Sequence, residues 1–259
     1  MLDLKISLLQ TTLLWEDPNG NRMILEEQLK PLRKGSTDVI ILPEMFSSGF
    51  TMNAERVAES MNGSSVGWMK AMAKRKNAAV CGSLVIREGN KFFNRFIWAQ
   101  PDGKHKQYDK RHLFRMAGEH KTYAAGQKRL VIEYKGWRIF PQVCYDLRFP
   151  VWSRNNVNYD LLIYVANWPE RRRSAWKSLL PARAIENQSY LAAVNRVGKD
   201  GKDIPYAGDS IAYGPGGELL TDIEPYKGSL TTIRLRKSIL KDARESFPVA
   251  KDADRFLLR

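Results

Sequence analysis

The 259-residue sequence contains only two cysteines, Cys81 and Cys144, and only three histidines. Two cysteines are too few for a disulfide framework, and no group of cysteines and histidines has the spacing of a zinc site. No apolar run approaches the roughly 18–20 residues that a membrane-spanning helix needs. The first residues lack the charged segment and long apolar run of a signal peptide. We therefore expect a reduced, cytoplasmic protein that needs no metal or cofactor and has no membrane partner.

Acidic residues are also few, because 28 aspartates and glutamates stand against 42 lysines and arginines and leave a net charge of +14. Such a charge has to be weighed as the footprint of a nucleic-acid-binding protein. The basic residues are spread along the whole chain, however, and the only tight cluster is Arg171-Arg172-Arg173. No helix-turn-helix, RNA-recognition or zinc-finger pattern accompanies that cluster. We expect nonspecific attraction to polyanions at low salt and no specific nucleic-acid partner.

What is present is the composition of a globular domain, with 43% hydrophobic residues and no linker-like stretch. Apolar runs and turn signals predict strands at 4–10, 38–42, 78–86, 91–99, 104–109, 130–134, 137–143, 159–166, 190–195, 206–213, 218–223 and 230–235. Periodicity predicts helices from about 19 to 34 and at 65–76, 148–155, 174–186 and 236–244. The order strand–helix–strand–helix–strands occurs roughly twice. This pattern predicts one α/β domain over residues 1–259, with two packed sheets and outer helices.

Three reactive side chains, Glu44, Lys110 and Cys144, each follow directly on a predicted strand. Functional sites of α/β folds gather at such strand ends. Each residue also has a simpler interpretation. Most free cysteines are small buried hydrophobic residues, and most glutamates and lysines in loops are solvated. The apolar segment 45–50 after Glu44 favours a pocket wall over open water for that carboxylate, whereas segment 115–126 after Lys110 has no clean period and is predicted to be a loop.

The stretch 136–152, which reads GWRIFPQVCYDLRFPVW, gives Cys144 a special setting. A predicted strand ends at this cysteine, and a polar, turn-prone segment follows at once. This is the pattern of a nucleophile elbow, in which the sulfur is exposed at the end of the strand and the next backbone N–H groups point at any oxygen beside it. The pattern makes Cys144 a candidate nucleophile.

Three motifs in this order resemble the carbon–nitrogen hydrolase family, which is the nitrilase superfamily. They are Leu42-Pro43-Glu44-Met45-Phe46, Tyr108-Asp109-Lys110-Arg111-His112-Leu113 and Val143-Cys144-Tyr145-Asp146-Leu147-Arg148-Phe149-Pro150. The resemblance covers nearly the whole chain and is greatest to the small bacterial omega-amidases. It implies a four-layer α–β–β–α sandwich that often pairs into a homodimer. The tail 247–259, with its apolar turn 256–258, would suit such an interface.

The resemblance implies hydrolysis of the terminal amide of a 2-oxo acid such as 2-oxoglutaramate or 2-oxosuccinamate. An amide is a poor electrophile, so its hydrolysis gains from a thioester on Cys144. With no well-placed histidine, Glu44 is the obvious base and proton donor. Lys110 and the backbone N–H of Tyr145 would hold the oxyanion, and one such donor is typically worth about 3–4 kcal/mol. The resemblance adds Glu119 as a second glutamate that hydrogen-bonds Lys110 or orients the substrate.

The far end of such a substrate carries a carboxylate, which a guanidinium fork suits. Arg171, Arg172 and Arg173 are the candidates, although a solvated helix start remains the alternative for each. The remaining predicted substrate-binding residues are Phe46, Tyr145, Asn167 and Trp168. Other functions stay open: an amidase for deaminated glutathione, a carbamoylase, or a catalytically silent binding member.

Overall fold

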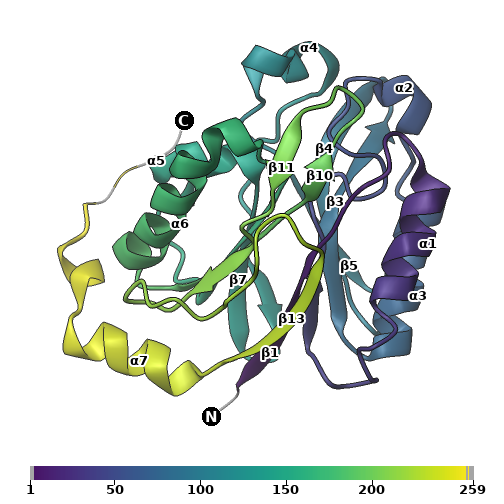
Figure 1. Ribbon diagram of the computed structural model, residues 1–259. Helices are drawn as coiled ribbons and strands as arrows, with labels where there is room; N and C mark the ends of the chain where they lie inside the picture. Colours follow the sequence, from purple (N-terminus) through teal and green to yellow (C-terminus); the bar gives the residue numbers. More distant parts are fainter. Residues whose placement is uncertain (1–2, 255, 257–259) are drawn as a thin grey trace.

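Two β-sheets lie face to face in the middle of the molecule, and helices cover their outer faces (Figure 1). The computed structural model describes residues 3–254 and 256. Sheet A has the order β13-β1-β2-β3-β4-β5, with bounds Ser229–Leu235, Leu4–Gln10, Val39–Ile41, Ala79–Glu88, Lys91–Ala99 and His105–Asp109. Sheet B has the order β12-β9-β8-β7-β6, with bounds Ile211–Tyr213, Tyr190–Asn195, Leu161–Ala166, Trp137–Val143 and Ile132–Tyr134. Strands β10 (Val197–Lys199) and β11 (Pro205–Ala207) form a separate ribbon.

The alternation of side chains along each strand builds two cores. In β4, Phe96 and Trp98 point into the core between the sheets, whereas Ile97 and Ala99 pack with the helices outside sheet A. Helices α1 (Pro18–Gln28) and α3 (Ser64–Lys76) cover that outer face, and α6 (Arg173–Asn187) covers the outer face of sheet B (Figure 1). The layers therefore follow the predicted order α–β–β–α.

Strand direction brings the functional positions to one edge of the sandwich. Strands β1, β2 and β3 are parallel, and β5 runs in the same direction as β3 because both are antiparallel to β4. Strands β7, β8 and β9 are also parallel to one another. The carboxyl ends of β2 and β5 lead to Glu44 and Lys110, and those of β7 and β8 lead to Cys144 and Asn167.

The remaining elements are short, apart from α7 (Lys237–Ser246) near the end of the chain. Short α-helices lie at α2 (Ala54–Val57), α4 (Glu119–Thr122) and α5 (Pro150–Ser153). Short 3₁₀ helices lie at η1 (Arg115–Ala117), η2 (Cys144–Arg148), η3 (Glu170–Arg172) and η4 (Val249–Asp252). The segment predicted as a loop at 115–126 thus contains η1 and α4.

Several predicted elements differ from the structure. The first helix ends at Gln28 instead of near residue 34, because Pro31 cannot donate the backbone hydrogen bond that a longer helix needs. The predicted strand 206–213 is divided between β11 and β12, because Gly208 and Asp209 have φ angles of +77° and +54°. Its predicted partner at 218–223 is reduced to a single bridge between Tyr213 and Leu219.

The tail is only partly described. Helix η4 lies within it, whereas Leu257 and Leu258 of the predicted apolar turn lie outside the described residues. Within the described ranges, no helix is long and apolar enough to cross a membrane.

Candidate active site

Glu44 is completely buried at the end of β2, and donors from both sheets hold its carboxylate. Its Oε1 accepts hydrogen bonds from Lys110 Nζ at 3.0 Å and from Asn94 Nδ2 at 2.7 Å. Its Oε2 accepts a hydrogen bond from the backbone N–H of Asn167 at 2.7 Å. Asn167 directly follows β8, which belongs to the other sheet. The following residue, Met45, adopts a φ of +43°, a strained conformation that persists only where surrounding contacts impose it. The carboxylate is therefore fixed in position across the two sheets.

Lys110 lies between two carboxylates. Its Nζ donates to Glu44 and also to Glu119, at 2.9 Å and 3.0 Å from the two Glu119 oxygens. Burial alone would lower the pKa of this lysine, but the negative charges of Glu119 and Glu44 outweigh burial and raise the pKa above its ordinary value. The residue is therefore a permanent cation at the base of the site.

Glu119 begins the short helix α4 and is fully buried, in a segment whose sequence lacks any periodic pattern. Its Oε2 also accepts the backbone N–H of Phe114 at 2.5 Å. Burial raises the pKa of this carboxyl against the opposing effect of Lys110. The structure thus brings together the three charged residues that the motifs and the resemblance predicted.

Cys144 occupies the turn from β7 into η2 with a φ of +46°. A non-glycine residue rarely adopts this conformation, which places the side chain at the end of the strand as an elbow requires. The sulfur lies 3.8 Å from the carbonyl oxygen of Asn167, and the residue is 8% exposed. Burial, with the negative charge of Glu44 added to it, raises the pKa of the thiol well above its ordinary value. The resting sulfur is consequently protonated at neutral pH and needs a base.

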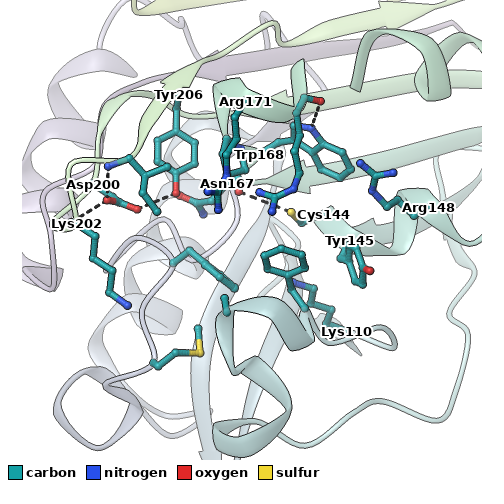
Figure 2. A pocket seen from close by; sticks show the side chains of 17 residues that line it. Lys110, Cys144, Tyr145, Arg148, Asn167, Trp168, Arg171, Asp200, Lys202 and Tyr206 are labelled. Atoms are coloured by element: carbon teal, nitrogen blue, oxygen red, sulfur yellow. Dashed lines mark hydrogen bonds between the residues drawn. The ribbon is translucent and has the colours of Figure 1, made fainter. Parts of the chain in front are cut away.

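Cys144 and Lys110 open onto a pocket of about 680 Å³, measured out to its mouth. Figure 2 shows Tyr145, Arg148 and Trp168 on one side of the sulfur and the hydrogen-bonded pair Asp200 and Tyr206 on the other. The pocket is lined by Phe50, Met52, Lys110, Phe114, Ala117, Cys144, Tyr145, Arg148, Asn167, Trp168, Pro169, Arg171, Arg172, Asp200, Lys202, Ile204 and Tyr206. This volume suits a small molecule.

Three arginines give the pocket a positive charge. Arg148, Arg171 and Arg172 line it, and none of them forms an ion pair with a carboxylate of the described residues. Burial and the repulsion of Arg171 and Arg148 lower the pKa of Arg172. One buried nitrogen of Arg172, Nη1, has no hydrogen-bond partner among the described residues. An anion bound at this position would relieve both the repulsion and the unpaired donor.

Two predicted substrate-binding residues do not reach the pocket. Phe46 is fully buried in the core outside sheet A, with its ring centroid 5.9 Å from that of Trp68. The left-handed conformation of Met45 turns the chain so that the Phe46 side chain points away from the site. Arg173 pairs instead with Asp209, with Nε to Oδ2 at 2.6 Å, because α6 begins there and turns the residue away from its neighbours.

The segment 200–206 supplies four lining residues that were not predicted from the sequence. Its polar composition resembles that of an ordinary surface loop. One signal was available, since this segment follows the end of β9, which is parallel to β8 in the same sheet. The chain leaving β9 therefore starts at the edge that carries Cys144. Asn94, which binds Glu44, gave no signal of its own.

A buried cysteine on a strained turn, beside a fixed carboxylate and a fixed cation, is arranged for nucleophilic acyl transfer, the chemistry of thiol-dependent hydrolases. The comparisons with known proteins agree. The carbon–nitrogen hydrolase family model matches residues 5–241. The chain is 47% identical to the protein named Omega-amidase YafV of Escherichia coli K12, covering 100% of both chains. It is 34% identical to the protein named 2-oxoglutaramate amidase of Bacillus subtilis, covering 95% of this chain and 96% of the relative.

One solved structure has the same fold as this chain. XC1258 of Xanthomonas campestris, described as a CN-hydrolase superfamily protein with an arsenic adduct in its active site, is 48% identical with a TM-score of 0.97 over 100% of both chains. The chain belongs to the carbon–nitrogen hydrolase family, and the predicted α–β–β–α fold is confirmed. It is a hydrolase that acts on carbon–nitrogen bonds other than peptide bonds.

Proposed function

We propose that this protein is an omega-amidase that hydrolyses the terminal amide of 2-oxoglutaramate or 2-oxosuccinamate to the acid and ammonia. The observation that carries the proposal is the pocket, which has a thiol beside the Glu44–Lys110 pair at its base and unpaired arginines in its wall. An amide at one end and a carboxylate at the other end of a small molecule match these two regions. The names of the relatives from E. coli and B. subtilis support the same substrate class.

Acylation begins when Glu44 takes the thiol proton as the Cys144 sulfur attacks the amide carbon. The raised pKa of the thiol makes this base necessary at neutral pH. The carbonyl oxygen becomes an oxyanion, which Lys110 Nζ and the backbone N–H of Tyr145 stabilise. That N–H lies in the first turn of η2, where backbone donors lack intrahelical acceptors. When the carbon–nitrogen bond breaks, Glu44 returns the proton to the leaving nitrogen, which departs as ammonia and leaves a thioester.

Deacylation repeats these steps with water. Glu44 takes a proton from water, the resulting hydroxide attacks the thioester carbon, and the same two donors hold the second oxyanion. The carbon–sulfur bond then breaks, the acid leaves, and the proton returns from Glu44 to Cys144. Glu119 keeps Lys110 in place through both steps by its two hydrogen bonds.

Among the three predicted arginines, Arg172 is the best candidate for the substrate carboxylate. Its unpaired Nη1 is buried, whereas Arg171 is exposed at the rim and Arg173 is already paired. The ring of Phe114 packs under the guanidinium, with the carbon 4.8 Å from the ring centroid, and holds its plane. Asn167 and Trp168 line the wall between this arginine and Cys144.

The test is ammonia release from both 2-oxo amides by wild type, Cys144→Ala and Cys81→Ala. Cys81 is the matched control, because it is the other buried cysteine and lies in the core away from the pocket. We expect turnover in wild type and in C81A and none in C144A. A folded wild type that leaves both amides intact would contradict the substrate. A thioester on Cys144 from deaminated glutathione, or an S-carbamoyl adduct on Cys144 from a carbamoyl compound, would then indicate another amidase. The absence of any such adduct would indicate a silent member.

The proposed function also includes a location in the cell and an oligomeric state. We propose a cytoplasmic homodimer in which the tail 247–259 contributes to the interface. Its exposed described part, with Phe247 71% exposed, supports a covered position in an assembly. A monomeric mass in solution at micromolar concentration would contradict the dimer.

A further inference from the structure

Asp146 lies two residues after Cys144, is completely buried, and accepts four hydrogen bonds. Its Oδ2 accepts from the backbone N–H of Val143 at 3.0 Å and from the hydroxyl of Tyr108 at 2.8 Å. Its Oδ1 accepts from the backbone N–H of His112 at 2.9 Å and from Nδ1 of the same residue at 2.8 Å. Four donors from three residues, which lie on two segments of the chain, therefore converge on one side chain.

The pattern of donors requires a carboxylate. The oxygen of Tyr108 already accepts hydrogen bonds from Trp152 Nε1 at 2.9 Å and from the backbone N–H of Arg111 at 3.2 Å, so its own proton must go to Asp146. Burial, and then the charge of Asp146, raise the pKa of Tyr108 and keep it a donor. An ionised carboxylate accepts at both oxygens, whereas an amide of the same shape would turn an N–H group toward two of these donors.

The four donors belong to the two halves of the site. Tyr108 and His112 each lie two residues from Lys110, on the segment that leaves β5 in sheet A. Val143 is the last residue of β7 in sheet B and precedes Cys144. The ring of His112 also stacks on Phe149, with centroids 3.7 Å apart. Asp146 is thus bonded to the chain on both sides of Lys110 and to the strand end that carries the nucleophile.

We propose that Asp146 is a positioning residue that sets the relative placement of the Lys110 ammonium, the Cys144 sulfur and the Tyr145 backbone N–H. The inference rests on the proposed roles of these three groups. It assigns Asp146 no contact with the substrate, since it does not line the pocket. Its loss should slow the chemical steps while leaving substrate binding at Arg172 nearly intact, because that anchor lies on η3 after another strand.

The test compares Asp146→Asn with Asp160→Asn. Asp160 is a matched control, because it is also buried and its Oδ2 accepts the backbone N–H of Arg138 at 2.7 Å near the opposite end of β7. We expect kcat of D146N to fall by about 10²-fold, the cost of a small misplacement of reacting groups, with KM changed less than about threefold. We expect D160N to keep the kcat of the folded wild type. The rate of Cys144 alkylation by iodoacetamide, followed by mass spectrometry, is expected to fall in D146N and not in D160N.

Separate controls distinguish a folding defect of the variant, and a failure of the proposed substrate, from a failure of the inference about Asp146. Rates are normalised to the folded fraction. If D146N does not fold, Tyr108→Phe takes its place: it removes one of the four donors to Asp146, together with the acceptor of Trp152 Nε1 and the Arg111 N–H, and keeps the ring. We expect a smaller loss of kcat in Y108F, in the same direction. A kcat of D146N or Y108F equal to that of wild type, or equal alkylation rates in D146N and D160N, would overturn the inference. If wild type releases no ammonia from either 2-oxo amide, the proposed substrate fails, whereas the alkylation comparison still tests Asp146.

Discussion

Arg172 and Arg173 are neighbours in the sequence with opposite surroundings. The first has a buried nitrogen without a partner and faces other cations, whereas the second is paired with Asp209. A charge-assisted hydrogen bond to a carboxylate is worth about 1.5–3 kcal/mol, or roughly 10–100-fold in affinity. We therefore predict that Arg172→Met raises KM for 2-oxoglutaramate by about this factor while kcat changes little, as steady-state kinetics can measure.

Arg173→Met is the control for that change. We expect it to lower the free energy of unfolding, because Asp209 loses its partner, and to leave KM near the wild-type value. Equal rises of KM in both variants would assign the effect to the net charge of the pocket mouth instead of to one guanidinium.

Single residues also show what the sequence could and could not reveal about the site. Glu44, Lys110 and Cys144 were predictable because each follows directly on a predicted strand, which for Glu44 and Cys144 is an apolar run. The residues that hold these three side chains in place were not predictable. Asn94 and Asp146 act through side-chain hydrogen bonds that depend on strand register and on the packing of one sheet against the other. Neither property is visible in the local sequence.

At the scale of elements, the β10–β11 ribbon forms one wall of the pocket. Its tip carries Asp200, Lys202 and Ile204, and Gly201 between them lies against Trp15. A Cβ atom added at Gly201 would lie 2.3 Å from Trp15 Cγ, which is too close for any side chain. This glycine therefore allows the ribbon to dock where it lines the site.

We predict that Gly201→Ala moves the ribbon tip and lowers kcat/KM by about tenfold, mainly through a higher KM, since overpacking of this kind costs about 1–3 kcal/mol. Gly67→Ala is the control, because a Cβ at Gly67 in α3 meets nothing within 4 Å. A kcat/KM for G201A within twofold of the G67A value would contradict the role of the ribbon.

The same ribbon belongs to a region whose strands could not be predicted correctly from the sequence. Long apolar runs such as those of β7 and β8 were predicted because a strand buried on both faces has few polar residues. The region 197–223 consists of three-residue strands whose course depends on left-handed residues at Gly208 and Asp209. Strands this short leave too little alternation to be read from the residues alone.

The whole molecule should lose stability in alkaline solution, because burial raises the pKa of the Cys81 thiol well above its ordinary value. The unfolded chain ionises this thiol above about pH 8.5, whereas the folded chain keeps it neutral. Stability is therefore fully present below pH ~8.5 and is lost as the pH rises from there toward the folded-state pKa. At pH 10 one such thiol costs the folded state about 2 kcal/mol.

We predict that Cys81→Ala removes this contribution. Denaturant unfolding with a reducing agent, at pH 7 and pH 10, should show a loss in the free energy of unfolding that is smaller by about 2 kcal/mol in C81A than in wild type. The comparison uses the change between the two pH values, so the lower starting stability of a core truncation does not enter. An equal loss in both proteins would contradict the predicted burial of the thiol.

The edge of sheet A has a consequence for biosynthesis. Strand β1 lies between β2 and β13, and its antiparallel pairing with β13 runs from Leu4 opposite Leu235 to Gln10 opposite Ser229. A ribosome releases β1 long before it has made β13. Until the last strand emerges, the nascent chain therefore carries an open strand edge of the kind that pairs with other chains. We therefore expect the first strand of the newly made polypeptide to stay open to such pairing until β13 docks beside it.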